Sequence, residues 1–247
     1  MMRVSLLAIA LVVSLPGFVF AQEWSLYVSA QDGFKIDFPG EPTVTAITWV
    51  SEQGYSLPAN VYTVERGLER YSITAVDYSG IEQQGLERSK ACPPGAETCL
   101  GQTEGLLLGV IGPGYAFQDI RGALIYASLK FIQRDATVTH YTWAFTDLVE
   151  GQVLQLTNAD GSRTFVSIFM RDNHLYVAEG TVPKGYPEPG LFQQSLGFVD
   201  EDGNGLRYET LYSNEFHGLG TYPPPPLRGR GGAAGPVGAA NPSAGVR

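Results

Sequence analysis

The sequence of 247 residues is poor in the residue types on which many enzymes and metal sites depend, with two cysteines and three histidines. His140, His174 and His217 stand far apart, and none has a second histidine or a cysteine at the spacing of metal ligands. We therefore expect these histidines to be solvated or hydrogen-bonded, and the sequence predicts no metal centre built on them.

Catalytic signature motifs are also missing. There is no Gly-x-Ser-x-Gly elbow, no His-Glu-x-x-His and no dinucleotide fingerprint. The glycine-rich residues 101–114 lack the Lys-Ser/Thr pair that completes a phosphate-binding loop. Serines and acids are plentiful, so a triad assembled in space stays open. The sequence itself predicts no catalytic residue and no organic cofactor.

Long apolar runs are confined to the N-terminus. Arg3 is followed by the uncharged run Val4–Leu15, and Val19–Ala21 fits a small-residue cleavage site. We predict that residues 1–21 are a signal peptide and that the mature chain begins at Gln22. There is no cysteine near this site, which argues against a lipid anchor. No later apolar run is long enough for a membrane helix. We expect an exported protein, periplasmic or secreted, without a membrane span.

Basic residues are outnumbered, since 16 lysines and arginines face 25 acidic residues and give a formal net charge of -9. Three of the arginines, Arg228, Arg230 and Arg247, lie in a C-terminal stretch without acids. This balance disfavours nucleic acid and anionic lipid surfaces as partners of the folded part. The partners that we expect are an envelope protein or a small ligand.

The two cysteines, Cys92 and Cys99, enclose only six residues. In an oxidising compartment such a pair favours a local disulfide, which would stabilise the loop by roughly 2 to 3 kcal/mol. A redox dithiol is the alternative, although the spacing is not Cys-x-x-Cys. We predict a disulfide that stabilises one loop.

The N-terminal half shows the alternation of half-buried strands. Phe34, Ile36 and Phe38 fall on one face and Lys35 and Asp37 on the other. Further strands are predicted over Trp24–Ser29, Val44–Val50, Asn60–Glu65 and Tyr71–Tyr78, separated by glycine-containing turns. This rhythm is typical of an antiparallel meander, and we expect one sheet.

Two helices are predicted in the middle of the chain. The capping-box pattern Ser79-Gly80-Ile81-Glu82 indicates a helix from Gly80 to Lys90. Asp119–Arg134 also alternates like a strand, but we favour a helix with Asp119 as its N-cap. The intervening residues 91–115 are expected to be irregular, and such a long loop could hold the site of an enzyme of unknown type.

The second half is again a meander and is expected to build the core. Strands are predicted at Thr139–Phe145 and Val153–Thr157. Phe165–Met170 and Leu175–Glu179 flank the polar residues 172–174, which indicates a hairpin. After a Pro/Gly-rich crossing, the apolar spacing of Leu191–Phe198 predicts a short helix.

An acidic turn follows this helix. Asp200, Asp202 and Asn204, with Gly205 at the sixth position, match the opening half of an EF-hand calcium loop. The second half fails, because Leu211 stands where the bidentate glutamate belongs. Calcium is therefore a possible cofactor at these three residues, with a plain solvated turn as the alternative.

The C-terminal part contains one predicted strand, Leu206–Ser213, and a tail. Residues 222–247 are rich in Pro, Gly and Ala and cannot bury enough apolar surface to offset ordering, so we predict a disordered tail. Its four consecutive prolines serve as a spacer or as a polyproline II ligand. The aromatic residues nearby either contact a partner or cover a sheet edge: Tyr186, Tyr208, Tyr212, Phe216 and Tyr222.

Several of these segments resemble the PsbP-like fold, which covers the extrinsic PsbP proteins of photosystem II and exported bacterial relatives. The matching stretches are residues 34–42, the strand over residues 71–78 and the run from Arg163 to Phe198. The resemblance implies an α+β fold, an antiparallel sheet flanked by helices, and it brings no catalytic residue. We expect a single domain over residues 22–221 that acts as a non-catalytic binding or accessory protein of the bacterial envelope. A calcium-stabilised structural module and an enzyme are the alternatives.

Overall fold

The computed structural model describes residues 24–91, 114–214 and 227–229. The predicted signal peptide, both cysteines and nearly all of the loop over residues 91–115 lie outside these ranges. So does the predicted tail, except for three of its residues. Within the described ranges, no helix is both long and apolar enough to cross a membrane.

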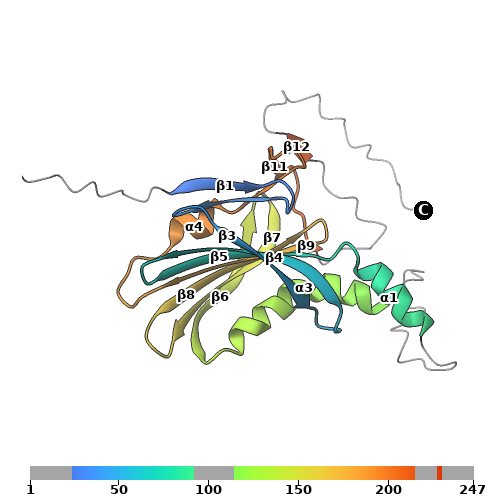
Figure 1. The fold of residues 1–247 in the computed structure, drawn as a ribbon, viewed down its shortest axis with the longest axis horizontal. Helices are drawn as coiled ribbons and strands as arrows, with labels where there is room; N and C mark the ends of the chain where they lie inside the picture. Colours follow the sequence, from blue (N-terminus) through green and yellow to red (C-terminus); the bar gives the residue numbers. More distant parts are fainter. Residues whose placement is uncertain (1–23, 92–113, 215–226, 230–247) are drawn as a thin grey trace, which may run out of the picture.

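A sheet of seven antiparallel strands forms the centre of the molecule (Figure 1). Its strands in spatial order are β3 (Thr43–Val50), β4 (Ser56–Arg66), β5 (Glu69–Asp77), β9 (His174–Val182), β8 (Arg163–Arg171), β7 (Val149–Asn158) and β6 (Ala136–Thr146). Strands that are adjacent in this sheet are also consecutive in the sequence, with one exception: β5 lies beside β9. The two predicted meanders are thus joined side by side through the β5–β9 pair.

The structure has a second, smaller sheet. It contains the first two strands of the chain, which we expected in the same sheet as the strands that follow them. Its order is β1 (Ser25–Ser29), β2 (Phe34–Phe38), β10 (Gly197–Val199), β11 (Gly205–Tyr208) and β12 (Leu227–Gly229). The expectation of one sheet was therefore wrong. Strand β12 lies in the segment that we predicted to be disordered, and β11 is shorter than the strand predicted over Leu206–Ser213.

In the described ranges, the helices that accompany the sheets are α1 (Ile81–Lys90), α3 (Gly114–Ile132) and α4 (Gly190–Ser195). Helices α1 and α3 lie on one face of the large sheet, while the small sheet and α4 cover the other (Figure 1). The fold is thus mostly antiparallel sheet: the two longer helices flank one face of the large sheet, and the small sheet with the short helix α4 covers the other.

Two helix predictions need correction. The helix predicted over Leu191–Phe198 ends at Ser195, because Leu196 takes an extended backbone (ψ 126°) and Phe198 pairs with Phe34 of β2. The helical choice for Asp119–Arg134 is confirmed, but the helix begins at Gly114. Asp119 therefore lies inside α3 and does not cap it.

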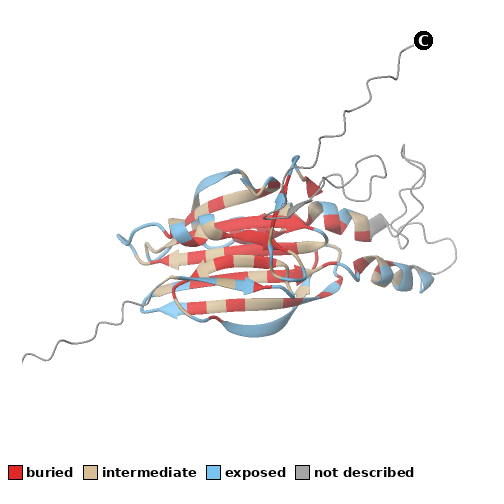
Figure 2. Cartoon of the chain, turned by 90° about the horizontal axis from the view of Figure 1, so that it is seen from above, coloured by how far each residue is buried: buried red, intermediate tan, exposed pale blue. Residues whose placement is uncertain are grey.

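The central hairpin β8–β9 packs against both layers. Leu175 and Val177 point toward the helical layer, and Tyr176 and Ala178 point toward the small sheet. Eight of the nine residues of β8 are buried, and the red of buried residues fills the central strands in Figure 2. This two-sided burial explains the nearly continuous apolar sequence of the hairpin. The prediction that the core is built here is confirmed.

Candidate functional site

Three turns from distant parts of the sequence meet around one cleft. They are the β1–β2 turn (residues 30–33), the β8–β9 turn (residues 171–174) and the acidic β10–β11 turn (residues 199–202). The cleft has a volume of about 490 Å³, and Tyr176 and Leu206 also line it. It lies at the end of the small sheet, where the two sheets separate around the tip of the central hairpin.

The β8–β9 turn is a tight two-residue turn. Asp172 and Asn173 have φ angles of 50° and 59°, the left-handed region that Asp and Asn tolerate best among non-glycine residues. Arg171 and His174 pair across the turn. The backbone amide of Asp172 donates to the Tyr212 hydroxyl at 3.0 Å, so the C-terminal segment supports the turn. The local sequence thus fixes where Arg171 and His174 project.

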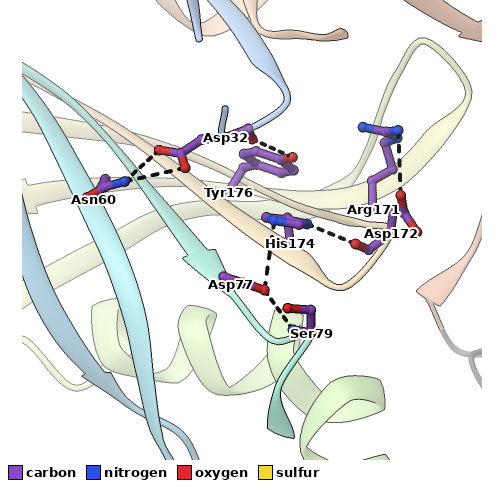
Figure 3. A network of polar contacts seen from close by, with 8 residues as sticks. All are labelled: Asp32, Asn60, Asp77, Ser79, Arg171, Asp172, His174 and Tyr176. Atoms are coloured by element: carbon purple, nitrogen blue, oxygen red, sulfur yellow. Dashed lines mark hydrogen bonds and ion pairs between the residues drawn. The ribbon is translucent and has the colours of Figure 1, made fainter. Parts of the chain in front are cut away.

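Asp32 is anchored from both ends (Figure 3). Its Oδ2 accepts hydrogen bonds from the Tyr62 hydroxyl at 2.5 Å and from Asn60 Nδ2 at 3.0 Å. Figure 3 draws the contact with Asn60. The backbone carbonyl of Asp32 accepts from the Tyr176 hydroxyl at 2.9 Å. Burial raises the pKa of Tyr62 and of Tyr176 well above the ordinary tyrosine value. Both hydroxyls therefore stay protonated donors, and Asp32 is held as a fixed acceptor in the cleft wall.

Arg171 is a buried cation, with a side chain only 10% exposed. Its Nε donates to the Tyr208 hydroxyl at 2.8 Å, and its Nη2 lies 3.9 Å from Asp172 Oδ2. Burial alone would lower the pKa of Arg171, but the Tyr208 hydroxyl and the nearby Tyr176 and Asp172 outweigh it and raise the pKa. The guanidinium is therefore a permanent charge in the cleft wall.

His174 lies between two acceptors (Figure 3). Its Nδ1 donates to the Asp172 backbone carbonyl at 2.9 Å, and its Nε2 is 3.8 Å from Asp77 Oδ1. Asp77 is itself positioned by the Ser79 amide, which donates to the same Oδ1 at 2.7 Å. The ring also stacks on Tyr176, with centroids 6.4 Å apart. These contacts fix the orientation of the imidazole in the cleft.

The calcium candidates all lie in the acidic turn beside the cleft. Asp200 Oδ1 accepts from the backbone amides of Asp202 and Asn204 at 3.0 and 2.8 Å, and Asn204 Nδ2 donates to Asp200 Oδ2 at 3.2 Å. These hydrogen bonds, that of the Asn204 amide first, lower the pKa of Asp200. Its carboxylate thus closes the turn. Among the described residues, no group of three or more His, Cys, Asp or Glu side chains has a metal-binding arrangement.

Negative charge dominates the cleft. Five carboxylates line it, and they face the guanidinium of Arg171 and the imidazole of His174. Their residues are Asp32, Asp172, Asp200, Glu201 and Asp202. The Asp172 side chain is 76% exposed and so is accessible to a ligand. An arrangement of this kind attracts positively charged groups, and Arg171 adds a single anchor for an anionic or carbonyl group.

Sequence reasoning found the turns but missed the residues that meet in the cleft. Asp32, Arg171 and Tyr176 were not singled out, and His174 was expected to be solvated or hydrogen-bonded without a role in a site. The only signal for the site is that each of the three turns carries an aspartate. Two of the aromatic residues expected to be exposed are not, because Tyr208 is buried against Arg171 and Tyr212 packs on Tyr208. Tyr208 and Tyr212 thus belong to the apolar cluster that includes the small sheet, whereas Phe216 and Tyr222 lie outside the described residues.

The described residues form an α+β fold with two antiparallel sheets. No protein-family model matches the chain, and no match is found among the curated proteins. Among solved structures, the chain is similar to cyanobacterial PsbP (CyanoP) from Synechocystis sp. PCC 6803, with a TM-score of 0.40 and 11% sequence identity. The match covers 76% of this chain and 99% of that protein. That protein carries the name PsbP, the name of the group that the sequence motifs resemble.

Proposed function

We propose that this protein is a non-catalytic binding or accessory protein whose ligand site is the cleft between the three turns. The observation that carries the proposal is that five acidic residues and the buried Arg171 line the same cleft. The ligand is a small molecule, or a chain end, that carries amino or guanidino groups, since such groups pair with carboxylates.

The contacts of the cleft residues favour binding over catalysis. Asp32 accepts from Tyr62 and Asn60, and Asp200 closes its own turn. The Tyr176 hydroxyl is engaged with a backbone carbonyl. Groups held in this way form a preorganised recognition surface, because they lose little conformational freedom when a ligand binds.

We place the protein in the bacterial cell envelope, and this part of the proposal rests on residues 1–21. The experiment is expression of the whole chain from its own start in a bacterium, followed by fractionation and N-terminal sequencing. We expect the protein in the periplasm or the medium, with Gln22 as the first residue. Recovery of the uncleaved chain in the cytoplasm would contradict export and leave the cleft proposal untouched.

Calorimetric titration with spermidine tests the ligand class. We expect saturable binding that weakens about fivefold for each exposed carboxylate removed, as for an ion pair near the surface. The variants are Asp172→Asn, which keeps a residue suited to a positive φ, and Asp202→Asn. Glu65→Gln is the matched control, since Glu65 is an exposed carboxylate outside the cleft lining.

Three outcomes decide the question. Loss of affinity in both cleft variants but not in the control supports the site. Equal weakening by Glu65→Gln would mean that spermidine responds only to the net charge of -9. Binding of calcium instead of spermidine, abolished by Asp202→Asn, would replace the proposal with the calcium-stabilised module.

A further inference from the structure

Strand β6 forms one edge of the large sheet, and its outer side has no partner strand among the described residues. Natural edge strands are usually protected by charged residues, by proline or by short length. The 11 residues of β6, Ala136–Thr146, contain no Asp, Glu, Lys, Arg or Pro. A bulge between Val138 and His140 interrupts the strand, but the register is regular from Tyr141 to Thr146. This second half is an unprotected pairing edge.

The same half of β6 carries an exposed aromatic row. Tyr141, Trp143 and Phe145 are 47%, 61% and 57% exposed. They share one face, because alternate residues of a strand point to the same side. That face is the α3 side of the sheet: Trp143 lies opposite Gln152, whose Oε1 accepts from Ser128 of α3 at 2.5 Å. Three adjacent large rings in solvent are unusual for a monomer's surface.

We propose that β6 is a homodimer interface, at which the strands of two copies pair antiparallel and join the two large sheets into one. The charge pattern points to a second copy as the occupant. The chain carries a net charge of -9, yet two copies that meet along residues 136–146 bring no charged side chain against another. A cationic partner would find no carboxylate on this strand and would bind elsewhere.

The symmetry also fits. Pairing of β6 with β6 is isologous and closes after two copies, whereas pairing of β6 with the other edge strand, β3, would leave free edges at both ends and grow into a fibre. A two-fold axis perpendicular to the sheet keeps the aromatic rows of both copies on the same face. The dimer therefore places both rows side by side in one continuous surface beside the two α3 helices.

The aromatic row selects the register. When Trp143 lies opposite the partner's Trp143, Tyr141 lies opposite the partner's Phe145, and every ring has an aromatic neighbour across the interface. A shift by two residues along one strand leaves one ring of each row without such a neighbour. Cross-strand aromatic pairs stabilise antiparallel strands, so the register centred on Trp143 is favoured.

The test is a charge swap at the two-fold axis, read out by sedimentation equilibrium on the exported chain. We expect a dimer for the natural sequence at micromolar concentration. Trp143→Glu and Trp143→Lys should each give monomers, because two like charges then face each other. An equimolar mixture of the two variants should restore a dimer through the Glu–Lys pair. Leu68→Glu, a substitution of a 78% exposed leucine in the β4–β5 turn, should leave the dimer intact.

The contrary results are equally defined. A natural chain that stays monomeric at 100 times that concentration, or Trp143 variants that stay dimeric, would overturn the proposal. A mixture that stays monomeric would overturn the register. Hydrogen exchange of the unmodified chain gives a check without substitution, since those amides of residues 141–146 that point away from β7 should gain protection as the protein concentration rises. Concentration-independent exchange in this segment would contradict the pairing.

Discussion

Asp119 shows how a single residue joins two elements of the fold. Its carboxylate, on α3, accepts hydrogen bonds from the Ser51 hydroxyl and from the Gln53 amide, the latter at 2.9 Å. Both donors belong to the β3–β4 turn, where the Tyr55 amide also donates to Ser51 Oγ. Asp119 therefore fixes this turn to the helix across 68 residues of sequence. Burial raises its pKa, although the bonds from Ser51 and Gln53 oppose the rise.

The raised pKa gives a signed pH dependence. The folded protein holds the Asp119 proton more tightly than the unfolded chain, whose value is near 3.8. The stability from Asp119 is therefore fully present below pH 3.8 and declines as pH rises through the folded pKa. The difference in unfolding free energy between the natural chain and Asp119→Asn should fall with rising pH and then level off. Urea unfolding from pH 3.5 to 7 measures it, and a difference that increases with pH would contradict this account.

Removal of the whole Asp119 side chain should lower the unfolding free energy more than the Asp119→Asn substitution does. Asp119→Ala leaves the Ser51 hydroxyl and the Gln53 amide without their acceptor, and should cost about 1 to 3 kcal/mol of unfolding free energy at pH 7. Urea denaturation gives the value. Asp135→Ala, a change of another acidic residue just after the same helix, is the control and should have little effect on stability. Equal losses in the two variants would show that the buried hydrogen bonds of Asp119 contribute nothing.

The buried pair of Arg171 and Tyr208 is the second residue-scale feature. Tyr208→Phe removes the acceptor of the Arg171 Nε hydrogen bond, and both residues are buried. A hydrogen bond to a charged group is worth about 1.5 to 3 kcal/mol, and the unfolding free energy should fall by this amount. Tyr186→Phe, at an exposed tyrosine, should be neutral. If the two variants have the same unfolding free energy, the hydrogen bond between Arg171 and Tyr208 does not stabilise the fold.

At the scale of elements, the two tight turns of the second meander differ in how well their residues suit them. Asp172 and Asn173 suit positive φ angles, but Leu148 of the β6–β7 turn has φ 66° and is a residue that rarely adopts this region. The turn is held by the C-terminal segment, since the Leu148 carbonyl accepts from the Tyr212 amide at 2.9 Å. The C-terminal segment thus offsets a local conformational cost.

Leu148→Asn should therefore stabilise the protein by up to about 1 kcal/mol, because asparagine reaches a positive φ with less strain. Thermal or urea unfolding measures the change. Leu68→Asn is the matched control: Leu68 is another exposed leucine in a hairpin turn, but its φ is not positive. A loss of stability at Leu148, or an equal gain at Leu68, would show that the turn carries no such cost.

Element prediction succeeded where the signal was local. The alternation of Phe34, Ile36 and Phe38 and the polar residues of the β8–β9 turn each identify a strand or a hairpin on their own. It failed where distant pairing decides. Phe198 has helical spacing with Leu191 and Ser195, but β2 offers its backbone a strand partner. Asp119 fits an N-cap, but the β3–β4 turn uses its carboxylate instead.

At the scale of the whole molecule, the cleft could not be predicted because it exists only after the two sheets pack. Tyr176 and Asp32 stand 144 residues apart and meet through one hydrogen bond. No spacing in the sequence encodes that contact. The sequence does predict the charge of the site, since three of its turns are acidic on a chain with net charge -9. The antiparallel meanders and the core hairpin were within reach of pattern reasoning, whereas the division into two sheets and the site were not.

The two proposed surfaces are separate. The cleft is lined by the turns around residues 32, 172 and 201, whereas the dimer edge is β6 on the α3 side of the large sheet. Substitutions at Trp143 should therefore leave spermidine affinity unchanged, and Asp172→Asn should leave the dimer unchanged. Either cross-effect, measured by calorimetry or sedimentation, would show that the two surfaces are coupled.

The central claim is that the cleft is the ligand site, and amide chemical-shift mapping by NMR during a spermidine titration tests it most directly. We predict saturable shifts concentrated in residues 31–33, 171–174 and 200–202, with the same affinity at each position. The same titration on Asp172→Asn should need more ligand to saturate. Shifts that are absent, that never saturate, or that cluster away from these three turns would contradict the account.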